Sequence, residues 1–91
     1  MNDVTQFSRS PKIVGSLVED EYILMSVDAG EFYTIDGPAA HIWQMLEEPQ
    51  TVATLIDGLM DAFEVDAQTC RADTAEMLAE MLDQKLIQQD G

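Results

Sequence analysis

The side chains best suited to nucleophilic or acid–base chemistry in this chain are a single histidine, His41, and a single cysteine, Cys70. Such a pair could act as a nucleophile and its general base, and either residue could bind a metal ion. His41 has no second histidine and no cysteine at ligand spacing, and it lies far from Cys70 in the sequence. We therefore predict no catalytic residue, no metal site and no bound cofactor, with Cys70 as a buried packing residue.

Carboxylates are the other abundant reactive group, with 18 Asp and Glu against 4 Lys and Arg, and a net charge of −14. Pairs such as Asp57 with Asp61 and Glu76 with Glu80 have helical spacing, which acidic helix surfaces produce by chance. The charge argues against nucleic acid and anionic membranes as partners, because both require a basic surface. It favours a neutral or cationic partner.

The first half of the chain has the composition of β-strands. Residues 12–18 and 22–27 are apolar and β-branched runs separated by an acidic turn, and residues 31–35 follow a turn that contains Gly30. These patterns predict a three-stranded antiparallel meander. Residues 1–10 are polar and lack a period, so we expect a flexible tail before a single domain of residues 11–91. The chain has no long apolar run and no signal-peptide pattern, so a cytoplasmic protein is expected.

The second half has helical periodicity. Asp36, Thr51 and Asp66 are suited to cap three helices, and Pro38 fits the first turn of the first helix, which Ile42-Trp43 would anchor. Residues 86–88 could add a short terminal strand. The fold class predicted is α+β, with a three-stranded antiparallel sheet followed by a three-helix bundle that resembles a winged helix-turn-helix. DNA reading is disfavoured because the third helix carries acids where a reading helix needs basic or amide side chains.

The third helix carries three parallel stripes. The stripe expected to face the core consists of Arg71, Ala75, Leu78 and Leu82. Beside it lies a second stripe of Cys70, Thr74, Met77 and Met81. The far side of the second stripe is bordered by acids at Asp73, Glu76, Glu80 and Asp83. The two methionines could fill gaps in the core or form the wall of a peptide groove. Strand 31–35 would be the opposite wall, with a free edge suited to pair with an extended peptide.

The ordered set of elements resembles the PqqD-like family, the recognition elements for ribosomally made, post-translationally modified peptides. The resemblance spans residues 13–87. It is carried by the strand 22–27, the turn at Gly30, the strand ending in Ile35-Asp36, the helix with Ile42-Trp43, residues 50–59 with their Leu and Ile spacing, Asp73 with Leu78 and Leu82, and Leu86-Ile87.

The resemblance implies a protein without catalytic activity that binds the leader segment of a precursor peptide. In that family the leader docks as an added strand on the third strand, against the third helix. Carried over by position, the peptide-binding residues would be Glu31, Phe32, Tyr33, Thr34, Ile35, Asp73, Thr74, Met77, Glu80 and Met81.

The resemblance also implies partner enzymes. The Ile42-Trp43 pair and the free-standing length are similar to the leader-binding proteins of lasso-peptide pathways, which work beside a leader cysteine protease and a cyclase. A peptide chaperone for a radical SAM enzyme, as in pyrroloquinoline quinone synthesis, is the alternative. A third possibility is an acidic winged-helix module that binds a folded protein or a second copy of itself.

Overall fold

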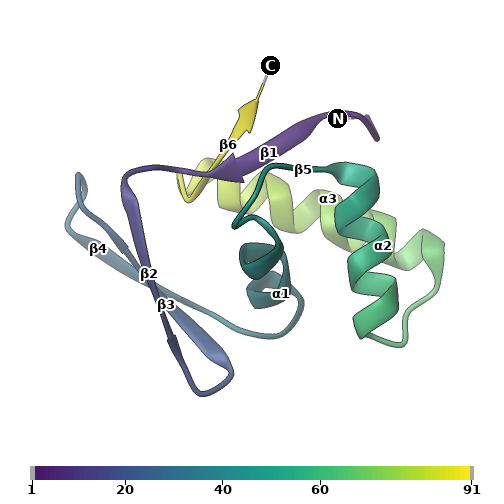
Figure 1. Cartoon of the computed structure of the whole chain (residues 1–91), viewed down its shortest axis with the longest axis horizontal. Helices are drawn as coiled ribbons and strands as arrows, with labels where there is room; N and C mark the ends of the chain where they lie inside the picture. Colours follow the sequence, from purple (N-terminus) through teal and green to yellow (C-terminus); the bar gives the residue numbers. More distant parts are fainter. Residues whose placement is uncertain (1, 91) are drawn as a thin grey trace.

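The computed structural model describes residues 2–90 as an α+β fold in which two small antiparallel sheets flank three helices (Figure 1). In chain order the elements are β1 (Gln6–Arg9), β2 (Ile13–Val18), β3 (Glu21–Ser26), β4 (Glu31–Ile35), α1 (Gly37–Met45), β5 (Gln50–Thr51), α2 (Val52–Ala62), α3 (Ala67–Asp83) and β6 (Ile87–Asp90). Within residues 2–90, no helix combines the length and apolar character needed to cross a membrane.

The predicted meander is confirmed as the sheet β2-β3-β4. A two-residue turn joins Val18 to its partner Glu21, and Gly30, with φ of 66°, closes the turn before β4. A positive φ at this position suits a residue without a Cβ atom. The register places Gly15, Leu24 and Tyr33 side by side across the three strands, on the face that meets α1. This register fixes which side chains of β4 face the helices.

The expectation of a flexible tail over residues 1–10 is wrong for its second half. Residues 6–9 form β1, which lies between β5 and β6 in a second antiparallel sheet (Figure 1). Phe7 is completely buried, and the Arg9 guanidinium donates hydrogen bonds of 2.6 and 3.0 Å to the carbonyl of Trp43. The segment QFSR has one apolar residue and therefore no alternating pattern, so its strand depends on partners far away in the sequence.

The helix caps follow the sequence signals in two of three cases. The hydroxyl of Thr51 accepts a 3.2 Å hydrogen bond from the Thr54 N–H, and the carboxylate of Asp66 accepts one of 2.9 Å from the Thr69 N–H. Asp36 occupies the N-cap position of α1, but its side chain makes no capping hydrogen bond. The short α1 instead depends on Ile42 and Trp43, both buried as predicted.

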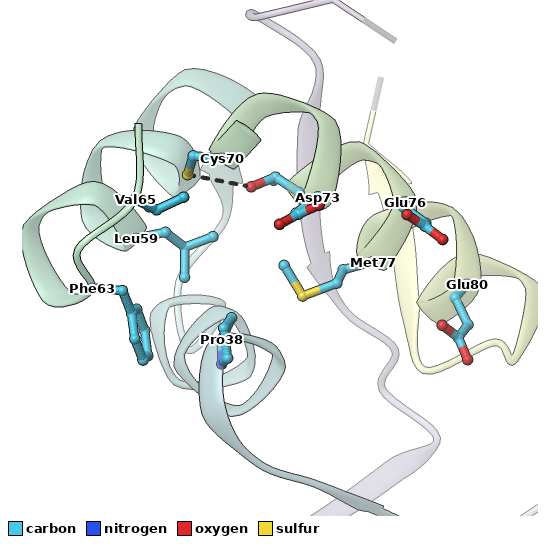
Figure 2. Close-up of a pocket in the computed structure, with 10 residues that line it drawn as sticks. Pro38, Leu59, Phe63, Val65, Cys70, Asp73, Glu76, Met77 and Glu80 are labelled. Atoms are coloured by element: carbon cyan, nitrogen blue, oxygen red, sulfur yellow. Dashed lines mark hydrogen bonds between the residues drawn. The ribbon is translucent and has the colours of Figure 1, made fainter. Parts of the chain in front are cut away.

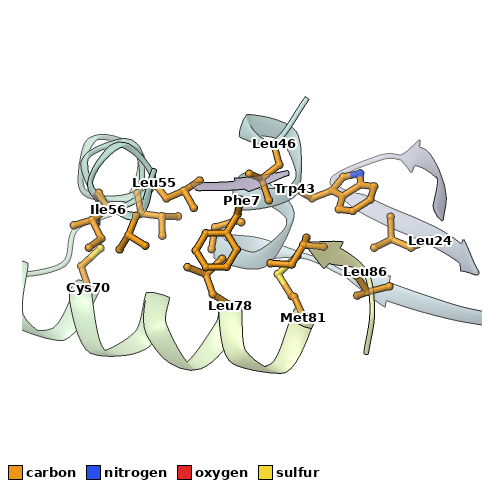
Figure 3. Close-up of a cluster of buried hydrophobic side chains, with 14 residues drawn as sticks. Phe7, Leu24, Trp43, Leu46, Leu55, Ile56, Cys70, Leu78, Met81 and Leu86 are labelled. Atoms are coloured by element: carbon orange, nitrogen blue, oxygen red, sulfur yellow. Dashed lines mark hydrogen bonds between the residues drawn. The ribbon is translucent and has the colours of Figure 1, made fainter. Parts of the chain in front are cut away.

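The core lies between α3 and the elements packed across it (Figure 3). Phe7, Trp43, Leu55 and Leu78 are at its centre, and each is at most 1% exposed. The predicted core face of α3 is wrong at two positions: Arg71 and Ala75 are exposed, and Arg71 pairs with Asp3. The buried residues of α3 are Cys70, Thr74, Leu78 and Met81. Most of the second stripe therefore faces the core, and only Met77 in that stripe stays half-buried.

Candidate functional site: a trough between strand β4 and helix α3

The β2-β3-β4 sheet has two free edges, and one of them belongs to β4, which pairs only with β3 among residues 2–90. The Val27 N–H donates to the Lys12 carbonyl at 3.2 Å, so the odd-numbered residues of β3 direct their backbone groups toward β2. Backbone groups alternate sides along a strand, so Tyr22, Leu24 and Ser26 bond to β4. Their partners in β4 are Ile35, Tyr33 and Glu31. The N–H and C=O groups of Phe32 and Thr34 therefore point to the unpaired edge.

The side chains of β4 divide between the two faces of the sheet. Tyr33 and Ile35 are half-buried on the helix side, whereas Phe32 is 68% exposed on the opposite side. The phenol of Tyr33 donates a 2.8 Å hydrogen bond to the carboxylate of Glu31. This hydrogen bond raises the pKa of Tyr33 above its usual value, because it stabilises the neutral phenol beside a negative charge.

A hollow of about 250 Å³ lies directly between β4 and α3. It is lined by Tyr33 to Ile35 from β4, by Ala39 from α1, and by Met77, Glu80 and Met81 from α3. A second hollow, of about 330 Å³, adjoins the first on the side of the α2–α3 loop. The two hollows share Met77 and Glu80. An adjoining hollow of about 540 Å³ at the opposite end shares Tyr33 and Gln84. We call these three hollows together the trough.

The second hollow combines an apolar floor with an acidic border. Figure 2 shows Pro38, Leu59, Phe63 and Met77 directed toward it from three helices. The acids Asp73, Glu76 and Glu80 also line it, all from α3 (Figure 2). The predicted acidic stripe of α3 therefore borders this hollow. An apolar side chain that carries a cationic end would match both parts.

Nine of the ten predicted peptide-binding residues line the hollows of the trough; the exception is Phe32, which belongs to β4 but directs its side chain to the opposite face of the sheet. Met77 and Glu80 line two hollows each, and Asp73 lines the second. Thr74 and Met81 border the hollows but are 0% and 4% exposed, so they present little surface of their own. Direct contact between these ten residues and a peptide stays a prediction.

The trough also includes residues of α1 and α2 that the sequence does not predict to lie there. Pro38 and Ala39 enter it from the first turn of α1, and Leu59 and Phe63 from the end of α2. Phe63 was recognisable as the last member of the apolar stripe of α2, and its 36% exposure indicates that the core does not use it fully. Its place in the trough depends on how α2 packs against α3, which periodicity does not give.

The two residues first considered for chemistry have packing roles. The centroids of the His41 and Phe63 rings are 5.8 Å apart, and the two rings are nearly perpendicular. The Cys70 thiol lies in the core, 3.7 Å from the carbonyl oxygen of Ile56. Among residues 2–90 there is no group of three or more His, Cys, Asp and Glu side chains arranged to hold a metal ion. The trough is thus a surface of apolar side chains, carboxylates and unpaired backbone groups, which is suited to binding.

Comparison with known proteins identifies the family. The family model described as coenzyme PQQ synthesis protein D (PqqD) matches residues 21–87. The chain belongs to the PqqD family. No curated protein matches the sequence of this PqqD-family chain. The family assignment confirms the resemblance derived from the sequence.

Two solved structures share the fold of this PqqD-family protein. The first is described as TbiB1 in complex with the TbiA(beta) leader peptide; it has a TM-score of 0.84 and 23% identity, covering 89% of this chain and 94% of that one. The second is described as lasso peptide synthetase B1 complexed with the leader peptide; it has a TM-score of 0.77 and 20% identity, covering 90% and 96%. At these identities the similarity establishes a shared fold over nearly the whole length of each chain.

Proposed function

We propose that this PqqD-family protein is a recognition protein without catalytic activity, which binds the leader segment of a ribosomally made precursor peptide in the trough. The observation that carries the proposal is the unpaired edge of β4, which lines the same hollow as α3. The leader would add as one more strand, with its backbone bonded to Phe32 and Thr34. Both solved structures with this fold are described as complexes with leader peptides, which supports the proposal.

The chemistry of the trough also indicates which peptides it would accept. Alternate side chains of an added strand point to the same face, so every second residue of the leader would enter the hollows beside Met77. Hollows of about 250 and 330 Å³ offer space for Leu-sized or aromatic side chains. The carboxylates of Asp73, Glu76 and Glu80 favour a Lys or Arg near the end that reaches the α2–α3 loop.

The proposed role in the cell is to bring the precursor to a modifying enzyme. A bound leader raises the effective concentration of the attached core peptide at that enzyme, without any reaction on the recognition protein itself. We propose a leader cysteine protease and a cyclase of a lasso-peptide pathway as the enzymes, because one structure with this fold is described as lasso peptide synthetase B1 and the sequence resembles the leader-binding proteins of such pathways. A radical SAM partner is the second candidate, favoured by the match to PqqD.

A further candidate function is that of an acidic winged-helix module that binds a folded protein or a second copy of itself. It is favoured by the net charge of −14 and by the three helices that follow the meander. It predicts association that does not involve the β4 edge. The two functions differ in the surface that becomes protected on binding, and amide exchange measures this directly.

The test is amide hydrogen exchange, measured by NMR with and without a synthetic peptide. The peptide has the sequence of the leader segment that a neighbouring gene encodes. On binding, the amides of Phe32 and Thr34 should become protected, whereas the amide of Tyr33, already paired with β3, should change little. Thr34→Pro removes an outward N–H without removing a β3–β4 hydrogen bond, and it should weaken the leader affinity. Leu17→Pro is the matched control, because Leu17 lies on the opposite free edge, in β2.

Two results would contradict the proposal. One is a leader that does not bind at any concentration tested, and the other is a leader that binds while the Phe32 and Thr34 amides exchange as fast as before. In the second case the peptide would lie in the trough without strand pairing, or at another surface altogether.

A further inference from the structure

The face of the β2-β3-β4 sheet that points away from the helices is apolar and uncovered among residues 2–90. The register aligns Val14, Met25 and Phe32 in one row across the three strands, and Ser16, Ile23 and Thr34 in the next. Val14 is 54%, Ile23 38% and Phe32 68% exposed. We call these six residues, together with Val18 and Glu21 at one end, the outer face.

The composition of the outer face contrasts with the rest of the molecule. Glu21 is its only charged residue, although the chain carries a net charge of −14. Contiguous exposed apolar surface on a small protein is typical of an interaction site. In Figure 1 the helices lie on the other side of this sheet, and α1 is the helix nearest to it. Nothing in the folding of residues 2–90 accounts for the apolar side chains there.

The outer face is continuous with the proposed peptide site. Phe32 and Thr34 have their side chains on the outer face and their free backbone groups at the β4 edge. A peptide strand added at that edge would extend the sheet by one strand, and its alternate side chains would continue the outer face. A protein that docks on this face would therefore contact the recognition protein and the bound leader together.

The charges around the outer face indicate the partner. Glu21 lies at the β2–β3 end of the outer face, next to Glu19 and Asp20 of the turn, whereas Asp28 and Glu31 lie at the β3–β4 end and line the hollow on the helix side. Lys12 pairs with Asp28 at 2.7 Å, which offsets one of these charges. Two copies of this chain would bring acidic ends together, which disfavours self-association. An apolar patch with Lys and Arg around it would be complementary.

We propose that the outer face is the docking surface for the enzyme that acts on the leader-bound precursor, and that this enzyme presents an apolar patch bordered by Lys and Arg. The inference rests on the proposed function, since the leader strand forms part of the surface. Docking then depends on the leader, because the free protein offers only part of the contact area.

The test measures two affinities with purified full-length proteins. The first is the affinity of the recognition protein for the leader peptide. The second is its affinity, with and without bound leader, for the leader-removing protease encoded nearby. The double variant Val14→Thr/Ile23→Thr keeps β-branched side chains, and neither residue lies in β4. It should weaken protease binding at least about tenfold and leave the leader affinity within about twofold. Val4→Thr, at a position that is 78% exposed outside this sheet, is the control.

The outcomes separate the two proposals. Failure of the leader to bind the wild-type protein would overturn the proposed function. Normal leader binding with unchanged protease affinity in the double variant would overturn the docking surface alone. Concentration-dependent dimers that the double variant abolishes, seen by analytical ultracentrifugation, would show that a second copy occupies the face and would overturn the enzyme as its partner. Glu21→Lys should weaken protease binding, and the loss should shrink as the salt concentration rises.

Discussion

The phenol of Tyr33 and the carboxylate of Glu31 are joined by a 2.8 Å hydrogen bond along the helix-facing side of β4. Both residues line the hollow at one end of the trough, and Tyr33 also lines the hollow between β4 and α3. The hydrogen bond therefore holds an aromatic ring in place beside the edge that would receive a peptide. It also couples the ionisation of this ring to a neighbouring charge.

Removal of the Glu31 carboxylate should change the pKa of Tyr33 that a titration measures. In a Tyr22→Phe background, Glu31→Ala should lower the pKa of Tyr33 toward the usual tyrosine value of about 10. Because the folded-state pKa is raised, the interaction stabilises the fold below the unfolded pKa and is lost as the pH rises through the folded pKa. Ultraviolet absorbance of the phenolate gives the midpoint. An unchanged midpoint would mean that the hydrogen bond does not persist in solution.

Met77 is the α3 residue best placed to report on the trough, because it is half-buried and lines two hollows. Met77→Glu should weaken leader binding by about tenfold or more, since a buried charge without a partner costs at least ~1.4 kcal/mol. Met60→Glu, on the exposed side of α2, is the matched control and should bind normally. Calorimetry gives both affinities. Equal affinities for the two variants would exclude Met77 from the binding surface.

Phe7 should be among the most sensitive positions for stability, although it lies in a strand of four residues. Phe7→Ala removes a completely buried ring from the core and should lower the free energy of unfolding by about 3–5 kcal/mol. That is a large part of the total stability of a small domain. Urea denaturation followed by Trp43 fluorescence measures it. Val4→Ala, at an exposed position, should change the free energy by less than about 0.5 kcal/mol; a similar loss in both would show that β1 is not part of the core.

The N-cap of α3 should make the stability of the fold depend on pH in the acidic range. The Thr69 N–H and hydroxyl both donate to the Asp66 carboxylate at 2.9 Å, and these hydrogen bonds lower the pKa of Asp66. A lowered folded-state pKa stabilises the fold above the unfolded pKa of about 3.9, and this contribution is lost as the pH falls through the folded pKa. Asp66→Ala should therefore lower the melting temperature at pH 7 but have a smaller effect near pH 2. Equal losses at both values would contradict the role of the charge.

Local signals in the sequence were sufficient for most elements. The β2–β4 meander was predictable from β-branched runs and Gly30, and α2 and α3 from their periodicity and the caps at Thr51 and Asp66. β1 was not predictable, because its only apolar residue is Phe7 and its partners lie near residues 50 and 88. Strands of this kind are specified by tertiary packing and have little local pattern of their own.

In the candidate site, too, some features could be predicted from the sequence and others could not. The free β4 edge was predictable because consecutive strands joined by short turns pair in chain order, and the acidic side of α3 because helical spacing is a local property. The buried face of α3 was misplaced, since its apolar arc is wide and Arg71 was assigned inward although it pairs with Asp3 at the surface. The walls formed by Pro38 and Phe63 depend on angles between helices, which depend on packing across the whole core.

The pairing of β1 with β6 also constrains how the protein is made. Residues 6–9 leave the ribosome before their partners at residues 87–90, which follow α3 in the chain. The second sheet can therefore close only after residues 87–90 have left the exit tunnel. Until then Phe7 lacks part of the sheet and core that bury it, so the nascent chain carries this aromatic residue outside its final packing.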